Sequence, residues 1–237
     1  MPRILNPNLH IMIAAARRLG ELCDKMVFIG GCATGLLITD PAAPAVRPTI
    51  DVDVIIEVVS RSELYEFETE LRKIGFHQTL TEDVPICRWI AEDIILDVMP
   101  TKTDILGFSN KWYTPALVKA KRIEIQKNLK VNMITAPYFL ATKMEAFLTR
   151  GNSDYYGSHD LEDMIAVIDG RPEILDEIYN ENDDLKKYLA EKFGFLNQDS
   201  AFMEAIPCHL PPDQASQDRA SIITKRLRQI IEAGTNT

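Results

Sequence analysis

Asp51-Val-Asp-Val-Ile-Ile-Glu-Val-Val59 is the stretch of sequence that decides the fold of the first half of this chain. Its apolar, largely β-branched residues predict a buried strand, because such side chains pack well on a pleated surface. Side chains alternate across a strand, so Asp51 and Asp53 fall on one face and the residues between them fall on the other, against a core. The stretch therefore predicts a strand that carries two carboxylates on the same face.

A shorter apolar run, Met26–Ile29, precedes this strand by about twenty residues and is followed directly by two glycines. The run predicts a second buried strand. Gly30 and Gly31 would let the backbone turn closely enough for amide N–H groups to face a phosphate. The pair of strands therefore predicts a phosphate-binding turn beside the two carboxylates.

A third carboxylate, Asp97, interrupts the apolar run Ile94–Met99, which also predicts a strand. A buried charge is costly and needs a partner or a metal. Two carboxylates on one strand face, with Cα atoms roughly 7 Å apart, can share divalent ions, and a third would complete the cage. Each aspartate taken singly is better explained as a strand-end residue beside a loop. The three together with the glycine pair favour a metal site.

The composition indicates a globular protein, because the chain has 237 residues of which 46% are hydrophobic, enough for one large domain or two modest ones. No apolar stretch is long enough to span a bilayer, and the N-terminus lacks the pattern of a secretion signal. We therefore expect a cytoplasmic protein without membrane contact. The four cysteines have no CxxC spacing and predict reduced core residues; they are Cys23, Cys32, Cys87 and Cys208.

The net charge of −9 disfavours a protein that coats nucleic acid through bulk electrostatics. Within residues 101–130, however, seven Lys or Arg residues stand against two acidic ones, and Phe108, Trp112 and Tyr113 lie among them. This stretch could bind RNA with stacking aromatics. A solvated basic helix face beside core aromatics explains it somewhat better.

Hydrophobic periodicity and capping residues predict an α/β (α+β) fold with a small mixed sheet in the first half and a helical bundle in the second. The domain change is expected between residues 1–135 and 136–237. Strands are expected at 26–29, 51–59, 87–90, 94–99 and 129–134. Helices are expected at 8–22, 32–38, 60–74, 137–150, 158–168, 172–179, 184–193 and 219–233.

A second polar cluster lies in the helical half, where Lys143 precedes the segment Ser158–Asp163. A lysine that reaches a triphosphate would stabilise charge on the transferred phosphate and on the leaving group. A lysine stem lying along a half-buried helix is the alternative. Ser158 with acids in the first helical turn is also what a capped helix requires, so Asp160 and Asp163 have a structural explanation too. If Lys143 acts on the nucleotide, its removal should barely change the melting temperature.

In their order along the chain, these motifs resemble the AbiEii/AbiGii-type toxin nucleotidyltransferases, a branch of the DNA-polymerase-β-like superfamily. The resemblance covers roughly the first 170 residues. Its matching positions are Gly30-Gly31, Arg47-Pro-Thr-Ile-Asp51-Val-Asp53, Asp97, Lys143 in Ala141-Thr-Lys-Met-Glu-Ala146, and Asp160 to Asp163. The resemblance implies an N-terminal nucleotidyltransferase domain, a C-terminal helical domain, and an active-site cleft between them.

The resemblance also implies an Mg²⁺-dependent transfer of a nucleoside monophosphate from a nucleoside triphosphate to a hydroxyl group, with Mn²⁺ as an alternative ion. The implied metal ligands are Asp51, Asp53 and Asp97, which with Lys143 form the catalytic set. The implied nucleotide-binding residues are Gly30, Gly31, Arg47, Thr49, Lys143, Asp160 and Asp163; Arg88 and Arg171 are weaker candidates for phosphate contact.

Two features of the chain depart from the family pattern. Cys32 follows the glycine pair where the superfamily usually has Ser or Thr, so the backbone would have to bind phosphate without a hydroxyl. The nineteen residues 32–50 between Gly31 and Asp51 are more than in many relatives, and their prolines predict an extended loop that shapes the substrate pocket.

The acceptor stays open at the level of sequence. By resemblance it is RNA such as tRNA, or a protein, with an antitoxin as a further partner; a small-molecule acceptor of the antibiotic type is the alternative. A non-catalytic module that binds a nucleotide or a partner is an alternative from a different class of function. Three costly carboxylates kept together argue against such a module.

Overall fold

The computed structural model of the chain describes residues 6–79, 84–107, 110–151 and 153–235. Its contacts divide the chain into two compact units, which are described separately below. The first consists of Met1–Gly35 and Arg47–Thr135, and the second of Leu36–Val46 and Ala136–Thr237. The later boundary coincides with the expected domain change, but one segment from the first half belongs to the second unit.

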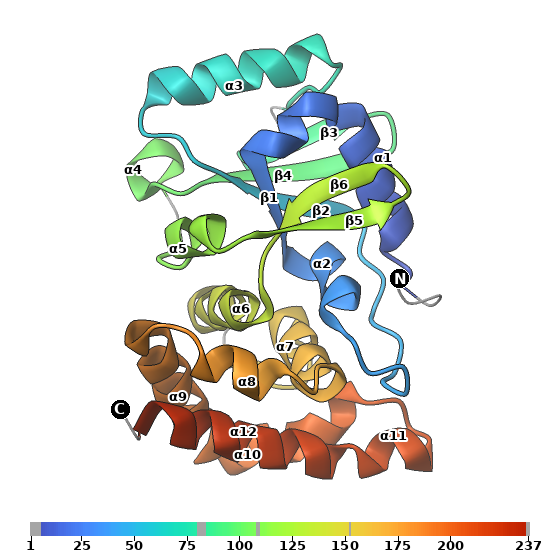
Figure 1. Ribbon diagram of the computed structural model, residues 1–237, viewed down its shortest axis with the longest axis vertical. Helices are drawn as coiled ribbons and strands as arrows, with labels where there is room; N and C mark the ends of the chain where they lie inside the picture. The colour runs from blue at the N-terminus through green and yellow to red at the C-terminus, as the bar shows by residue number, and fades with distance from the viewer. Residues whose placement is uncertain (1–5, 80–83, 108–109, 152, 236–237) are drawn as a thin grey trace. The chain divides into compact units, whose positions relative to one another are not determined.

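The first unit is built on a six-stranded mixed sheet with the order β3-β4-β2-β1-β6-β5 (Figure 1). Neighbours pair in parallel in β1–β6 and β2–β4, and antiparallel in β1–β2, β3–β4 and β5–β6. The strands are β1 Met26–Ile29, β2 Asp51–Ile56, β3 Arg88–Ala91, β4 Ile94–Pro100, β5 Lys121–Gln126 and β6 Leu129–Met133. The predicted mixed sheet is therefore confirmed.

Strand β5 is the one strand of this sheet that the sequence patterns do not predict. Its residues are mostly exposed, and Ile125 is the buried one, because β5 is an edge strand. Charged side chains are common on edge strands, where they discourage pairing with other chains. Part of the basic stretch is therefore an edge strand, and the expectation of a basic helix face is wrong for it.

The helices of the first unit are α1 Leu9–Leu19, η1 Gly20–Lys25, α2 Gly30–Leu37, α3 Arg61–Lys73, α4 Thr103–Leu106 and α5 Tyr113–Val118. Helix α1 packs on the sheet through Met12, Ala16 and Leu19 (Figure 1). Helix α3 begins where the Ser60 hydroxyl accepts a hydrogen bond from the Glu63 backbone N–H, as its capping residues predict. Helix α2 begins at Gly30, two residues earlier than expected.

The second unit is helical, as predicted. Its elements are α6 Ala136–Arg150, α7 His159–Gly170, α8 Ile174–Tyr179, α9 Asp183–Asn197, α10 Ser200–Ala205, η2 Ile206–His209, α11 Gln214–Asp218 and α12 Ala220–Thr235. Helix α12 packs along α9, α7 and α8, and α6 packs on α7 and α9 (Figure 1). Helix α6 is buried from Ala136 to Met144 and again at Phe147, and its last three residues are exposed.

The segment Leu36–Val46, which contains much of the proline-rich loop, is fixed to the second unit. The backbone N–H groups of Thr39 and Asp40 both donate to the Gly170 carbonyl at 2.9 Å. Ile38, Ala43 and Val46 form a small apolar cluster with Ala166 of α7. A side chain at position 170 would collide with Ile38, so Gly170 is needed for this approach. None of the helices in the part of the chain that the structure describes is long and apolar enough to cross a membrane.

Candidate functional site

The three predicted carboxylates lie on one face of the sheet, as the alternation of side chains predicts. Asp53 of β2 is paired in register with Asp97 of β4, and Asp51 precedes it by two residues on the same face. In the antiparallel partner strands, Ile29 lies opposite Asp53 and Arg88 lies opposite Asp97. Arg88, Asp97, Asp53 and Ile29 therefore form one row across β3, β4, β2 and β1.

The glycine turn lies directly against this row, because Gly30 follows Ile29. Gly30 has a φ of +66°, and a Cβ atom at this position would come within 1.9 Å of the Asp53 Oδ2 atom. The close approach is therefore possible only for a residue without a side chain. The turn and the carboxylate occupy the same end of the strands, as the sequence predicts.

Asn8 connects the glycine turn to the segment that leads into β2. The sequence patterns did not identify it as a site residue. Its side-chain amide donates to the carbonyl oxygens of Gly31 and Arg47, at 3.4 and 3.0 Å, and its Oδ1 accepts from the Thr49 N–H at 2.9 Å. Its exposure is 1%. From the sequence alone, a polar residue just before a helix is interpreted as a helix cap. The hydrogen bonds of Asn8 to residues distant in sequence are visible only in the folded structure.

Thr49 and Arg88 both bond to the carboxylates. The Thr49 hydroxyl donates to Asp51 Oδ1 at 2.7 Å. Arg88 Nε donates to Asp97 Oδ1 at 2.8 Å, and its Nη2 donates to Asp97 Oδ2 at 2.7 Å and to Asp51 Oδ2 at 3.0 Å. Hydrogen bonding to Asp97 raises the pKa of the Arg88 guanidinium. Arg88 is therefore a fixed positive charge among the carboxylates.

The donor types at this site fit a hard divalent cation, since carboxylate oxygens on one face are the ligands that Mg²⁺ prefers. The geometry does not yet form a cage: within the described ranges, no group of three or more His, Cys, Asp or Glu side chains is arranged to hold a metal ion. Arg88 takes up oxygens of Asp51 and Asp97 that the cage would use. The three-carboxylate cage therefore stays a prediction.

Two buried cysteines, Cys32 and Cys87, lie near this site. The Cys32 thiol points back to the strand and donates to the Ile29 carbonyl at 3.2 Å, so it does not replace the hydroxyl of the family pattern. Burial, with a smaller contribution from the charge of Asp97, raises the pKa of Cys87 to about 12. Both side chains are buried, as is that of Cys23, but Cys208 is exposed, so the expectation of a core residue is wrong for Cys208.

Lys143 lies in the second unit and forms its own cluster there. Its Nζ atom is 2.9 Å from Asp160 Oδ1 and 2.7 Å from Asp163 Oδ2, and all three side chains are at least 91% buried. Arg150 bonds to Asp160 as well, with Nε and Nη2 each 3.0 Å from a carboxylate oxygen. The two carboxylates therefore fix the position of the Lys143 ammonium group.

The burial of this cluster changes the expectation for Lys143. Removing one partner of a buried ion pair leaves an uncompensated charge and costs about 3–5 kcal/mol. The expectation of an unchanged melting temperature is therefore withdrawn. Arg171, the other cation considered in this half, is held by Glu177 and by the Leu37 carbonyl, so its position is structural.

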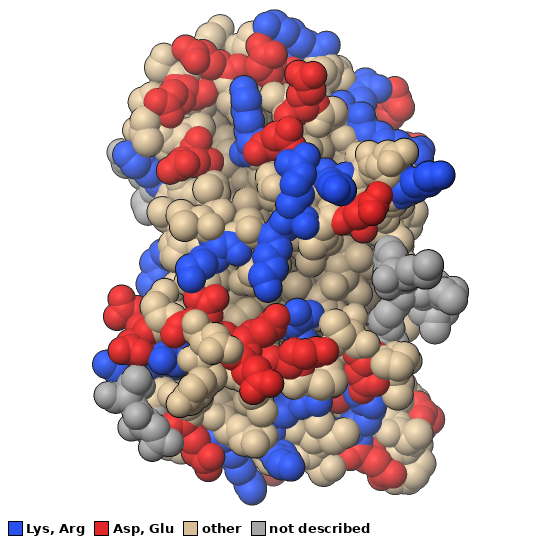
Figure 2. Space-filling view, in the orientation of Figure 1, with Lys and Arg blue, Asp and Glu red and all other residues tan. Residues whose placement is uncertain are grey.

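The basic stretch keeps its charges exposed but does not offer its aromatics. Lys119, Lys121 and Arg122 are exposed, and Arg122 forms an ion pair with Asp24 at 2.8 Å. Trp112 is 7% exposed, and the Tyr113 hydroxyl lies 3.4 Å from the Met99 sulfur, so both pack within the unit. Phe108 lies outside the described residues. On the face seen in Figure 2, basic and acidic side chains are interspersed.

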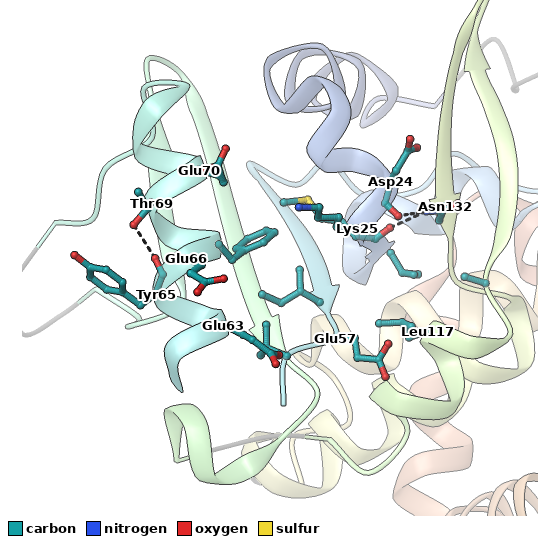
Figure 3. A pocket seen from close by; sticks show the side chains of 16 residues that line it. Asp24, Lys25, Glu57, Glu63, Tyr65, Glu66, Thr69, Glu70, Leu117 and Asn132 are labelled. Carbon is teal, nitrogen blue, oxygen red and sulfur yellow. Dashed lines mark hydrogen bonds between the residues drawn. The ribbon is translucent and has the colours of Figure 1, made fainter. Parts of the chain in front are cut away.

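A cavity of about 970 Å³ lies at the opposite end of β1 and β2 from the carboxylates, lined by Met26, Val27 and Ile56 among others. Acidic side chains outnumber basic ones along it, and Figure 3 shows Glu63 and Glu66 on α3 across from Lys25. Like charges repel, so this lining disfavours a triphosphate. None of the predicted site residues lines it.

Comparison with known proteins gives likenesses of structure alone. No family model and no curated protein matches the sequence. The structure is similar to that of JHP933 from Helicobacter pylori, with 11% identity, a TM-score of 0.49, and coverage of 96% of this chain and 91% of that one. It is also similar to a Helicobacter pylori protein described as a "putative nucleotidyltransferase", with 11% identity, a TM-score of 0.47, and coverage of 97% and 95%. At these values the function has to be argued from the residues of the site.

Proposed function

We propose that this chain is a metal-dependent nucleotidyltransferase that moves a nucleoside monophosphate from a nucleoside triphosphate to a hydroxyl group. The observation that carries the proposal is the row formed by Asp53 and Asp97 on adjacent parallel strands, with the Gly30 turn against Asp53. A phosphate-binding turn and a pair of carboxylates at the same strand ends are what phosphoryl transfer with a bound cation requires.

Each residue of the site would have a distinct role in this reaction. Gly30 and Gly31 begin α2 and would present backbone N–H groups to the phosphates. Asp51, Asp53 and Asp97 would hold the cation, and Asp97 would accept the proton of the attacking hydroxyl. Arg47, whose carbonyl Asn8 fixes, would contact phosphate charge. Magnesium, when bound, would supply the positive charge that stabilises the attacking and leaving oxygens.

Lys143 is the residue of the helical unit that would act on the nucleotide. Its ammonium group is held by Asp160 and Asp163, so its position is defined to within the geometry of two ion pairs. A positioned cation stabilises the charge that develops on a triphosphate. Asp160 and Asp163 would orient Lys143 or contact the nucleotide.

For the acceptor we propose RNA, of which tRNA is one example, with a protein as the second choice. The exposed Lys119, Lys121 and Arg122 support contact with an RNA backbone, which would weaken with added salt. A toxin of the AbiEii type, with an antitoxin as its partner, is the biological role that the motif order supports.

The test is transfer of label from each α-labelled nucleoside triphosphate to a mixed pool of RNA and protein, with and without Mg²⁺. Asp53→Asn should lower Mg²⁺-dependent transfer by roughly 10²-fold or more, because the transition state loses a charge that holds the cation. Far-UV circular dichroism should show a folded chain. Full Mg²⁺-dependent turnover in this variant would overturn the assignment.

Asp93→Asn is the matched control, since Asp93 is an exposed aspartate in the turn between β3 and β4. It removes the same charge and should transfer at the wild-type rate. An equal loss in both variants would mean that overall charge, and not the carboxylate row, sets the rate.

A non-catalytic nucleotide-binding module is the second candidate, and one observation favours it. Arg88 neutralises part of Asp51 and Asp97, which lets the carboxylates persist without a metal. In this case, the labelled triphosphate would bind in equilibrium dialysis, but no acceptor in the pool would become labelled.

A further inference from the structure

Arg88 bonds to two of the three carboxylates of the site, Asp51 and Asp97. Its guanidinium donates two parallel hydrogen bonds to Asp97 and a third to Asp51, at 2.7–3.0 Å. Two parallel bonds from a guanidinium to one carboxylate are among the strongest ion pairs in proteins. Side-chain exposure is 22% for Arg88 and 10% for Asp97, so solvent screens the pair only in part.

The position of Arg88 follows from the strand register. Arg88 lies opposite Asp97 across the antiparallel pair β3–β4, and Asp53 lies next to Asp97 across β2–β4. Three carboxylates so close on one face repel each other. A guanidinium at the end of the row reduces this repulsion, and its reach along the strands brings in Asp51.

We propose that Arg88 is the resident counter-cation of the carboxylate site, and that it competes with divalent metal ions for Asp51 and Asp97. The proposal rests on the metal-dependent function proposed above and adds the residue that sets the metal affinity. A divalent cation needs the oxygen lone pairs that Arg88 occupies, so binding requires that Arg88 give up its bonds.

This competition has a consequence that a purely structural ion pair lacks. Removing the charge of an arginine remote from the carboxylates lowers stability and leaves metal affinity unchanged. Removing the charge of Arg88 lowers stability without metal and raises metal affinity, both because a repelling charge is lost and because the carboxylate oxygens are freed. Arg88→Lys separates these two effects, since it keeps the charge and loses the two parallel bonds.

The experiment compares Mn²⁺ binding to the wild type and to Arg88→Met, by the loss of the free Mn²⁺ signal in electron paramagnetic resonance. Methionine keeps most of the stem length and none of the charge. The variant should bind Mn²⁺ about tenfold or more tightly, since the lost charge-assisted hydrogen bonds correspond to at least this factor. Its melting temperature should be lower without Mn²⁺ and should rise more on adding Mn²⁺.

Three further variants sharpen the result. Arg17→Met removes an exposed arginine of α1 that bonds to Gln126, and it should leave the affinity for Mn²⁺ unchanged. Arg88→Lys keeps a charge but cannot form two parallel bonds, so its affinity should lie between those of the wild type and Arg88→Met. Asp51→Asn combined with Arg88→Met should lose the gain in affinity.

The outcomes separate this proposal from the proposed function. Measurable Mn²⁺ binding in the wild type with no tighter binding in folded Arg88→Met overturns the role of Arg88 and leaves the metal site standing. No binding in any folded variant overturns both. If Arg88→Met does not fold, Arg88→Lys decides, and an affinity equal to or below that of the wild type overturns the proposal.

Discussion

At the scale of single residues, the site depends on one close approach. The Asp53 side chain packs so closely against the Gly30 backbone that a Cβ atom at position 30 would not fit. Gly30 also has a positive φ, which non-glycine residues adopt only at a cost. The glycine therefore serves two purposes, because it turns the chain after β1 and it allows the carboxylate to reach the turn.

Gly30→Ala should lower the free energy of unfolding and displace Asp53. The positive φ should cost about 1–3 kcal/mol, and the collision with Asp53 should add to it. Gly107→Ala is the control, because Gly107 has a φ of +83° and no atom within 4 Å of the added Cβ. Urea denaturation should show a clearly larger loss for Gly30→Ala. Equal losses would mean that Asp53 moves aside freely.

At the scale of secondary-structure elements, a cluster of charged side chains joins α6 to α7 in the helical unit. Lys143 and Arg150 come from α6, and Asp160 and Asp163 come from the first turns of α7. The Ser158 hydroxyl caps the same helix by accepting from the Leu161 N–H at 3.3 Å. Acids at a helix N-terminus also favour the helix dipole, so the cap and the ion pairs support each other.

This cluster predicts a specific dependence of stability on pH. Burial opposes the charge of Asp160, but Lys143 and Arg150 outweigh it and hold the pKa of Asp160 below its ordinary 3.8. A carboxyl with a lowered folded pKa contributes stability that is present above its unfolded pKa and lost as pH falls through its folded pKa. The contribution of Asp160 is therefore complete at neutral pH and lost progressively below about pH 3.8.

The measurement is the free energy of unfolding in urea from pH 7 to pH 3. Asp160→Asn should be less stable than the wild type at pH 7, and the gap should narrow as the pH falls below about 4. Asp184→Asn, at the exposed start of α9, controls for the loss of one negative charge. A gap that stays constant down to pH 3 would contradict the assignment of the lowered pKa to Asp160.

At the scale of the whole molecule, the chain passes between its two units three times, after Gly35, after Val46 and after Thr135. The segment Leu36–Val46 is held in the second unit by Arg219, which is far away in sequence. Arg219 bonds to Asp40 at 2.6 Å and to Asp169 at 2.7 and 2.9 Å. A cut at residue 135 would separate this segment from its partners.

Arg219→Met should therefore loosen Leu36–Val46 and lower stability by about 3–5 kcal/mol, because Asp169 would stay buried without its main partner. Hydrogen exchange should become faster at the amides of Thr39 and Asp40, which donate to Gly170. Arg228→Met, an exposed arginine on α12, should leave both readouts unchanged. Wild-type exchange at these amides would show that the segment is fixed by its apolar cluster alone.

Local patterns by themselves determined five of the strands, the longer helices and the shared face of Asp51 and Asp53. Strands Met26–Ile29 and Asp51–Ile56 follow from apolar alternation, and the caps at Ser60 and Ser158 follow from hydrogen bonds that close within three residues. Such features depend on neighbours in sequence, so the sequence suffices to predict them. The edge strand Lys121–Gln126 was missed, because an exposed edge does not need an apolar face.

Only the tertiary structure decided which residues meet across the chain. The register of β3 on β4 places Arg88 among the carboxylates, the fold of the first unit brings Asn8 to residues 31, 47 and 49, and Ala166 and Arg219 hold Leu36–Val46. These contacts join positions up to 179 residues apart. Their energy comes from burial and charge pairing that exist only once the units have folded, and no local pattern carries that information.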